Sequence, residues 1–146
     1  HPGSIRTGMS VSELHDVYGK PAEEYALPGI PPLRRLAYPE GGLEQQTWMV
    51  DVDANGRVAA VKPVISIEHF AQIKAGKDDV TSIRREFGPP YRVITYSWSG
   101  LTAWQYPYLE TNWWNLMMSV MFDANGIVVR TENGVDPRFL GGSDHQ

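Results

Sequence analysis

The sequence repeats itself, and this repeat limits the folds that the chain can adopt. The residues Asp-Ala-Asn-Gly occur at 53–56 and again at 123–126, an offset of 70. Upstream of each copy, segments 8–21 and 76–90 share a second pattern: a glycine, a polar start, a short run with helical periodicity, then aromatic-Gly-x-Pro. The chain is therefore expected to contain two copies of one small unit.

The first shared segment predicts a short amphipathic helix in each copy. Apolar residues recur at i, i+3 and i+7, which places them on one helical stripe: Val11, Leu14, Tyr18 and Val80, Ile83, Phe87. Ser10 and Glu13 form a capping-box pattern, and Asp78 is the expected cap of the second helix. Gly19 and Gly88 follow the helices at the position that favours positive φ, and prolines come soon after.

The second shared segment predicts β-hairpins. Alternating apolar residues precede each Asp-Ala-Asn-Gly, with Trp48, Val50 and Val52 matching Met118, Val120 and Phe122. Asn and Gly tolerate positive φ, and the Asp side chain can accept bonds from backbone amides in a turn. The expected turn residues are Asn55, Gly56, Asn125 and Gly126.

The stretch from Asp51 to Gly56, D-V-D-A-N-G, also matches the first half of an EF-hand calcium loop. The twelfth position of such a loop should supply a bidentate Glu, but here it is Lys62. In the second copy Met121 replaces the first carboxylate, and strand-like segments stand where helices should flank the loop. We therefore expect an architectural turn and no metal.

Together these patterns predict an α+β fold of two tandem repeats. Each repeat is expected to place a short helical pair on a three- to four-stranded antiparallel sheet. The leading helix of the second pair is expected over residues 66–76, whereas the first copy retains only residues 4–8 of that segment. The expected ranges are 1–65 for the first repeat, 66–140 for the second and 141–146 for a C-terminal tail.

Composition excludes several classes of function. The net charge is −4 and no stretch is strongly basic, so nucleic-acid binding is not expected. The chain has no cysteine, which rules out disulfides, thiolate metal sites and cysteine nucleophiles within it. No apolar run approaches the roughly 20 residues that a membrane-spanning helix needs.

Candidate catalytic residues are few. Of the four histidines, His15 lies in the first helical segment and His69 in the short segment before the second. Residues 97–100, Ser-Trp-Ser-Gly, only faintly resemble a nucleophile elbow, because no helix is expected after them. We expect a non-catalytic protein without a cofactor. An enzyme would need a concave pocket in which His15 or His69 is hydrogen-bonded to a carboxylate.

Aromatic residues are concentrated in one segment. Residues 96–114 hold seven of the sixteen aromatic side chains. Trp and Tyr combine a large apolar area with a polar group, which suits recognition surfaces. The candidate binding residues are Trp98, Trp104, Tyr106, Tyr108, Trp113 and Trp114. The alternative is that these rings cover the sheet or fill the junction between the units, and the binding partner could be a protein, a lipid headgroup or a glycan.

A second candidate contact lies in the proline-rich segment 28–35, P-G-I-P-P-L-R-R. Its prolines favour an extended backbone. Arg34 and Arg35 could meet an acidic partner or a lipid phosphate, but a solvated loop is the favoured interpretation of this segment.

The pattern shared by residues 5–21 and 73–90, together with Phe-Asp-Ala-Asn-Gly-Ile-Val at 122–128, resembles the SmpA/OmlA domain of BamE-type outer-membrane lipoproteins. The tandem arrangement is similar to that of the β-lactamase inhibitory proteins. The resemblance implies a pair of helices on an antiparallel sheet and a location in the periplasm. It also implies an outer-membrane tether through a lipidated N-terminal cysteine, which this chain lacks.

The resemblance further implies a non-catalytic binding module, acting in envelope integrity or outer-membrane protein assembly. Its expected partners are envelope proteins, including components of the β-barrel assembly machinery. The alternative is an inhibitor-like module that occludes a periplasmic or secreted enzyme. The chain departs from the lipoproteins because it is a tandem, and from the inhibitory proteins because it cannot form their disulfides.

Overall fold

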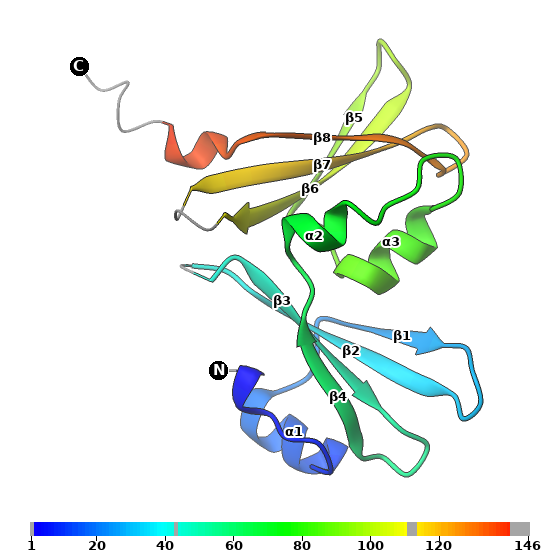
Figure 1. The fold of residues 1–146 in the computed structure, drawn as a ribbon, viewed down its shortest axis with the longest axis vertical. Coiled ribbons are helices and arrows are strands. Elements are labelled where there is room, and N and C mark those ends of the chain that lie inside the picture. Colours follow the sequence, from blue (N-terminus) through cyan, green and yellow to red (C-terminus); the bar gives the residue numbers. More distant parts are fainter. Residues whose placement is uncertain (1, 43, 111–113, 141–146) are drawn as a thin grey trace. The chain divides into compact units, whose positions relative to one another are not determined.

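The computed structural model describes residues 2–42, 44–110 and 114–140, and its chain divides into two compact units (Figure 1). The first unit comprises His1–Val64 and the three residues Phe87–Pro89. The second comprises Ile65–Glu86 and Pro90–Gln146. The sequence placed the division between residues 65 and 66, and it did not foresee that residues 87–89 group with the first unit. The tail expected at 141–146 lies outside the described residues.

Both units are built mainly from strands. The first contains η1 (Pro2–Ser4), α1 (Val11–Tyr18), β1 (Glu23–Leu27), β2 (Leu33–Glu40), β3 (Gln46–Val52) and β4 (Val58–Pro63). The later elements are α2 (Ile67–Phe70), α3 (Val80–Phe87), β5 (Arg92–Tyr96), β6 (Leu101–Leu109), β7 (Asn115–Phe122), β8 (Val128–Val135) and η2 (Pro137–Phe139). No helix among the described residues is long and apolar enough to cross a membrane.

The expected fold class of helical pairs on sheets is wrong. Strands take 44% of the described residues and helices 19%, so this part of the chain is mainly β. In the first unit the Gly8 N–H donates to the Val58 carbonyl (2.7 Å), which holds this segment along β4 instead of in a leading helix. In the second unit Gly76 makes the same bond to Val128 (2.7 Å), and the helix expected over 66–76 is limited to the single turn α2.

Each unit contains one four-stranded antiparallel sheet with its strands in chain order, β1-β2-β3-β4 and β5-β6-β7-β8. Successive antiparallel strands need only short turns between them, which fits the closely spaced turn signals of the sequence. Each sheet also has a register shift at the end of its third strand, between Asp51 and Val52 in one and between Met121 and Phe122 in the other.

The two Asp-Ala-Asn-Gly turns have matching hydrogen bonds. Asp53 Oδ1 accepts from the backbone N–H of Asn55 (2.9 Å) and Arg57 (3.0 Å). In the same way, Asp123 Oδ1 accepts from the backbone N–H of Asn125 (2.8 Å) and of Ile127 (3.1 Å). Gly56 and Gly126 have φ of 75° and 78°. In both turns one carboxylate oxygen of the aspartate therefore accepts from two backbone amides, as expected for an architectural turn.

The first residues of α1 and α3 are hydrogen-bonded to the Asp-Ala-Asn-Gly turns of their units. The Val11 N–H donates to the Gly56 carbonyl (2.8 Å), and the Val80 N–H donates to the Gly126 carbonyl (3.0 Å). Ser10 caps α1 by accepting from the Glu13 N–H (3.1 Å). The expected cap of α3 was Asp78, but the first-turn amide of Ser82 donates to Asp79 instead (2.8 Å).

The core of each unit lies between its main helix and its sheet. In the first unit Leu14 of α1 is fully buried with Leu36, Val50 and Val52. In the second unit the corresponding fully or almost fully buried residues are Ile83, Val120, Phe122 and Val128. Leu14 and Ile83 belong to the helical stripes predicted from the sequence. Val50, Val52, Val120 and Phe122 belong to the predicted alternating runs, whereas Leu36 and Val128 do not.

Candidate binding surface

Three of the candidate aromatic residues lie in the interior. Trp104, Tyr106 and Tyr108 are 8%, 2% and 1% exposed. They alternate along β6 and so share one face of the sheet. Phe70 of α2 packs on two of these rings, at 6.1 Å from Tyr106 and 5.4 Å from Tyr108 between centroids. These residues therefore drop out of the candidate surface, and the alternative that they cover the sheet describes them correctly.

Trp98 lies at the opposite extreme, because 83% of its surface is exposed. It sits in the connection between β5 and β6, residues 97–100, where the hairpin extends away from β7 and β8 (Figure 1). The turn is well defined: the Gly100 N–H donates to the Tyr96 carbonyl (2.9 Å), and Gly100 has φ of 75°. The Trp98 ring rests 6.2 Å from the Tyr96 ring, between centroids, at a 58° angle.

The first unit presents an apolar residue at the equivalent place. Residues 28–32 connect β1 to β2, and Ile30 in this connection is 102% exposed. Ile30 and Trp98 are the two most exposed large hydrophobic residues in the described part of the chain. We call residues 28–32 and 97–100 the hairpin tips. Neither contains a charged residue.

Sequence reasoning did not single out Ile30. A usable signal was present, because this β-branched residue lies between Gly29 and Pro31, outside any alternating run. Such a residue has no sheet face or helical stripe on which to be buried.

Of the two remaining tryptophan candidates, Trp114 lies directly before β7. Trp114 is 60% exposed, and its carbonyl accepts from the Glu110 N–H (3.2 Å). Trp113 lies outside the described residues. Trp114 therefore stays a candidate contact beside the hairpin tips.

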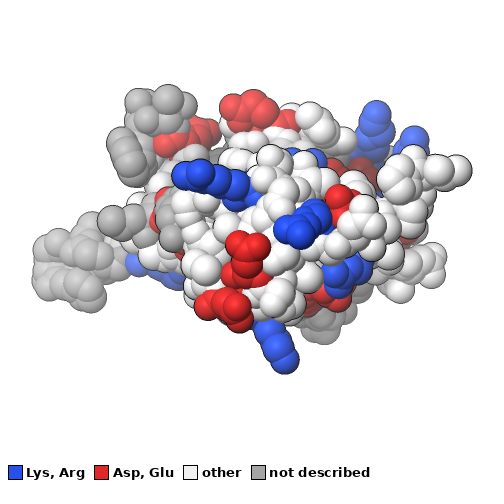
Figure 2. Space-filling view, turned by 90° about the horizontal axis from the view of Figure 1, so that it is seen from below, with Lys and Arg blue, Asp and Glu red and all other residues white. Residues whose placement is uncertain are grey.

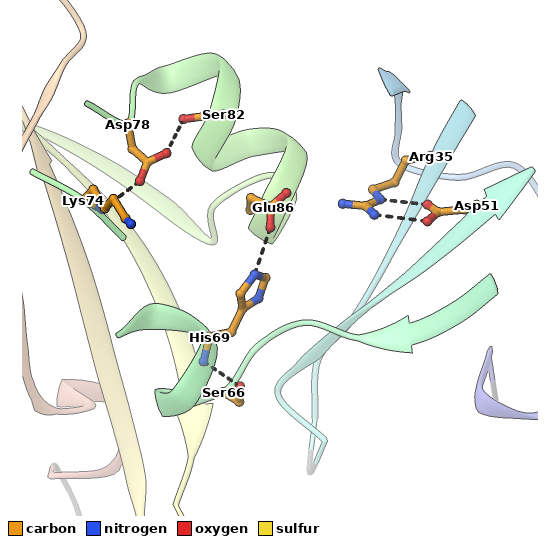
Figure 3. Close-up of polar contacts among 8 residues, drawn as sticks. All are labelled: Arg35, Asp51, Ser66, His69, Lys74, Asp78, Ser82 and Glu86. Carbon is orange, nitrogen blue, oxygen red and sulfur yellow. Dashed lines mark hydrogen bonds and ion pairs between the residues drawn. The ribbon is translucent and has the colours of Figure 1, made fainter. Parts of the chain in front are cut away.

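The two candidate arginines are placed very differently. Arg34 is half exposed and pairs with Glu24 across the β1–β2 hairpin (2.9 Å). Arg35 is only 5% exposed and forms a two-pronged ion pair with Asp51, Nε to Oδ1 at 2.7 Å and Nη2 to Oδ2 at 3.1 Å (Figure 3). Asp51, the first carboxylate of the calcium-like pattern, is therefore the buried partner of an arginine, and Arg35 cannot meet an external acid.

One histidine does meet a carboxylate. His69 Nε2 of α2 lies 3.0 Å from Glu86 Oε1 of α3, which is one of the two conditions named for an enzyme (Figure 3). The nearby Ser66 hydroxyl accepts from the backbone N–H of His69 (3.1 Å), so it caps the helix and is not aimed at the imidazole as a nucleophile would be. The pair links two short helices of the second unit.

Charge gives no extended binding patch on the face seen in Figure 2, where acidic and basic side chains are interspersed among uncharged ones. Among the described residues, no group of three or more His, Cys, Asp or Glu could hold a metal ion. The features that stand out are therefore the two uncharged hairpin tips, one in each unit.

No protein-family model matches the chain, and no curated protein sequence matches it either. Two solved structures are similar to it. One is a DUF4309 family protein, YjgB, from Bacillus subtilis: 13% identity, TM-score 0.36, with 86% of this chain and 77% of that chain covered. The other is from Streptococcus mutans and is provisionally named a beta-lactamase inhibitor protein: 16% identity, TM-score 0.37, with 92% and 87% covered.

These comparisons give the SmpA/OmlA resemblance no support, since no family model matches. The similarity to the two solved structures is too low for any arrangement or residue role to be transferred from them.

Proposed function

We propose that this protein is a non-catalytic binding module in which the hairpin tip of each unit can enter an uncharged cleft of a partner protein. The observation that carries the proposal is the exposure of Ile30 (102%) and Trp98 (83%) at equivalent positions of the two units. Apolar residues held in water on tight, defined connections lose little conformational freedom on binding. Tryptophan is also among the residues enriched at the energetic centres of protein interfaces.

The energetics favour the tips over the rest of the surface. A tryptophan can bury roughly 150–250 Å² on binding, and truncating such an anchor typically costs about 2–4 kcal/mol of binding free energy. The tips carry no charge, so their transfer into a cleft requires no desolvation of an ion. By contrast, Arg34 would have to give up its pairing with Glu24 before it met a partner.

The shape of the tips favours a concave partner. A hairpin connection of four or five residues is narrow and convex, and a cleft can surround it where a flat surface cannot. Active sites of enzymes are the commonest deep clefts of proteins. We therefore infer that the module acts by occluding the cleft of a periplasmic or secreted enzyme, and we favour this inhibitor-like role over a role in outer-membrane protein assembly.

The proposal is tested first on a β-lactamase, the target of the inhibitory proteins that the sequence resembles. Inhibition constants are measured for the wild-type protein and for the Trp98→Ala and Ile30→Ala variants. We expect the constant to rise about 30-fold or more for Trp98→Ala and about 10-fold for Ile30→Ala. Val17→Ala is the matched control, because Val17 is 66% exposed on α1 and belongs to neither tip.

A second experiment does not presuppose the target. A photo-crosslinking amino acid is placed at position 98, and in a parallel variant at position 17, in cells that produce the protein. We expect a discrete protein adduct from position 98 only, and its mass identifies the enzyme to be assayed. Equal or absent cross-linking from the two positions, together with inhibition unchanged by Trp98→Ala, would overturn the proposed use of the tips.

We propose the periplasm as the place of action, and a lipid tether to the outer membrane as the means of attachment. Both come from the family resemblance of the sequence. Fractionation of cells that produce the full-length gene product tests them, with release from the membrane fraction expected when lipoprotein processing is blocked. Recovery in the cytosol would rule out both.

A further inference from the structure

The edge strands of the two sheets are protected to different degrees. An edge strand presents unpaired backbone N–H and C=O groups, and proteins discourage pairing there with charges and prolines. β1 carries Glu23 and Glu24, and β4 ends in Lys62 and Pro63. β8 carries Arg130 and Glu132, which pair with each other (2.6 Å). Three of the four edges thus have a recognisable protective feature.

β5 is the exception. Its sequence is Arg-Val-Ile-Thr-Tyr, with a single charge at its first residue. Val93 on β5 is 54% exposed, and Tyr91 just before the strand is 56% exposed. Within the described residues β5 is the terminal strand of its sheet, paired only with β6.

The internal repeat shows how unusual this edge is. The first residue of each edge strand pairs with the neighbouring strand: Glu23 of β1 with Ala37 of β2, and Arg92 of β5 with Gln105 of β6. β1 and β5 therefore occupy the same place in their sheets. The residue after Arg92 is Val93, and the residue after Glu23 is Glu24. Where one copy of the unit places an ion-paired glutamate on its edge, the other places an exposed valine.

We propose that β5 is a self-association edge, at which it pairs antiparallel with β5 of a second copy of this chain around a twofold axis at Ile94. In this register Arg92 faces Tyr96 of the partner subunit, and Val93 faces Thr95 of the partner subunit. Each cation meets an aromatic ring, and β-branched residues meet each other, both of which are favourable cross-strand pairs. An in-register parallel arrangement would instead place two Arg92 side chains together.

The expected association is weak, because five residues a side bury much less than the roughly 1,200 Å² of a stable interface. A dissociation constant on the order of 0.1 mM is consistent with such a contact. The pairing would remove Val93 from water and join the two sheets into one of eight strands. This inference is independent of the hairpin tips, since residues 97–100 lie outside the paired strand.

Sedimentation velocity on the full chain tests the association. Between about 10 µM and about 1 mM the weight-average mass of the wild type should rise from 16.4 kDa toward twice that value. Val93→Glu gives β5 the residue that β1 has at this place and should hold the mass at one chain. Val17→Glu puts the same charge on an exposed valine of α1 and should behave as wild type. A wild-type mass that stays at one chain throughout overturns the proposal.

Cysteine scanning tests the register. Because the sequence has no cysteine of its own, any disulfide must come from the introduced residue. Ile94→Cys should form a disulfide between copies, because residue 94 lies on the twofold axis. Val93→Cys and Thr95→Cys should cross-link far better when mixed than when either is alone. Circular dichroism of each variant confirms that the sheet is retained. Cross-linking of Ile94→Cys no faster than that of Val17→Cys would exclude the antiparallel β5 pairing.

Discussion

The buried ion pair of Arg35 and Asp51 gives the sharpest prediction for single residues. Both residues are only 5% exposed, and the Arg35 guanidinium donates two hydrogen bonds to the Asp51 carboxylate. Removing one partner leaves a charge without compensation in the interior, so Arg35→Met or Asp51→Leu alone should lower the free energy of unfolding by about 3–5 kcal/mol. Urea denaturation measures the change.

The double variant separates the charge effect from packing. In Arg35→Met/Asp51→Leu neither charge remains, and apolar side chains fill a comparable volume. We expect the double variant to be at least as stable as either single one and close to the wild type. Additive losses would mean that the surroundings of the pair, not the pair itself, dominate its contribution.

Tyr38 gives a prediction about alkaline pH. Burial raises the pKa of its phenol above the ordinary value of 10.0, and the negative charge of Glu24 raises the pKa further. The folded protein thus favours the neutral phenol, while the unfolded chain ionises near pH 10. The stability that Tyr38 contributes is therefore fully present below pH 10 and is lost as the pH rises through the folded-state value.

The Tyr38→Phe variant measures this effect. It loses the bond from the Tyr38 hydroxyl to the Gly19 carbonyl (3.0 Å), so near pH 7 it should be about 1 kcal/mol less stable than the wild type. Above pH 10 the difference in the free energy of unfolding between the two proteins should narrow, because only the wild type must keep a phenol neutral at residue 38. The other tyrosines affect both proteins equally. A gap that widens with pH would contradict the argument.

At the scale of elements, the two helix-ending glycines have similar backbones but different surroundings. Gly19 and Gly88 have φ of 76° and 82°. A Cβ at residue 19 would meet nothing within 4 Å, whereas at residue 88 it would lie 3.0 Å from Cγ2 of Thr47. Gly19→Ala should cost about 1–3 kcal/mol through backbone strain, and Gly88→Ala about 1–3 kcal/mol more through overpacking.

A companion substitution isolates the contact at residue 88. Thr47→Ser removes the methyl group that the new Cβ would meet. In that background Gly88→Ala should cost nearly the same as Gly19→Ala in thermal or urea unfolding. If the cost of Gly88→Ala does not fall in the Thr47→Ser background, then its excess over the cost of Gly19→Ala comes from the backbone.

The elements that the sequence predicted well are those with local causes. The turns at Asn55-Gly56 and Asn125-Gly126 lie where residue chemistry demands positive φ, and the alternating runs before them became β3 and β7. The leading helix expected over 66–76 was predicted too long: only the turn α2 forms, and the segment then runs to Gly76, which bonds to Val128 about 50 residues away in the chain. Local periodicity carries no information about such a bond. The cap of α3 moved by one residue, from Asp78 to Asp79, for a similar reason: Asp78 is engaged by Lys74 and Ser82.

The candidate surface was only partly predictable. Trp98 lies two residues after the end of β5, and its place in a four-residue connection exposes it. Trp104, Tyr106 and Tyr108 share an alternating pattern that fits either an exposed or a covered face, and only the position of Phe70 shows that the face is covered. Arg35 could not be distinguished from Arg34 in the sequence, because one register step decides which of the two points toward Asp51.

At the scale of the whole molecule, the duplicated unit is conserved in its backbone contacts and divergent in its surface. The helix-to-turn and glycine-to-strand bonds recur with nearly equal lengths in both copies. The first edge strand and the hairpin tip differ in almost every residue. Duplication thus provides two frameworks of the same construction, and the side chains at the tips and edges distinguish what each copy can bind.

The division of the chain leads to a last prediction. Residues 87–89 belong to the first compact unit although they are distant in sequence. Gly88 approaches the side chains of Ala37, Thr47 and Met49, which are buried to 0%, 5% and 0% exposure. A fragment ending at Val64 lacks this cover and has a length at which a single core is marginal. We therefore expect fragment 1–64 to show no cooperative urea transition by circular dichroism, whereas the full chain does. If the fragment unfolds cooperatively at the midpoint of the full chain, then β1 to β4 with α1 suffice for stability, and the three later residues contribute nothing measurable to that unit.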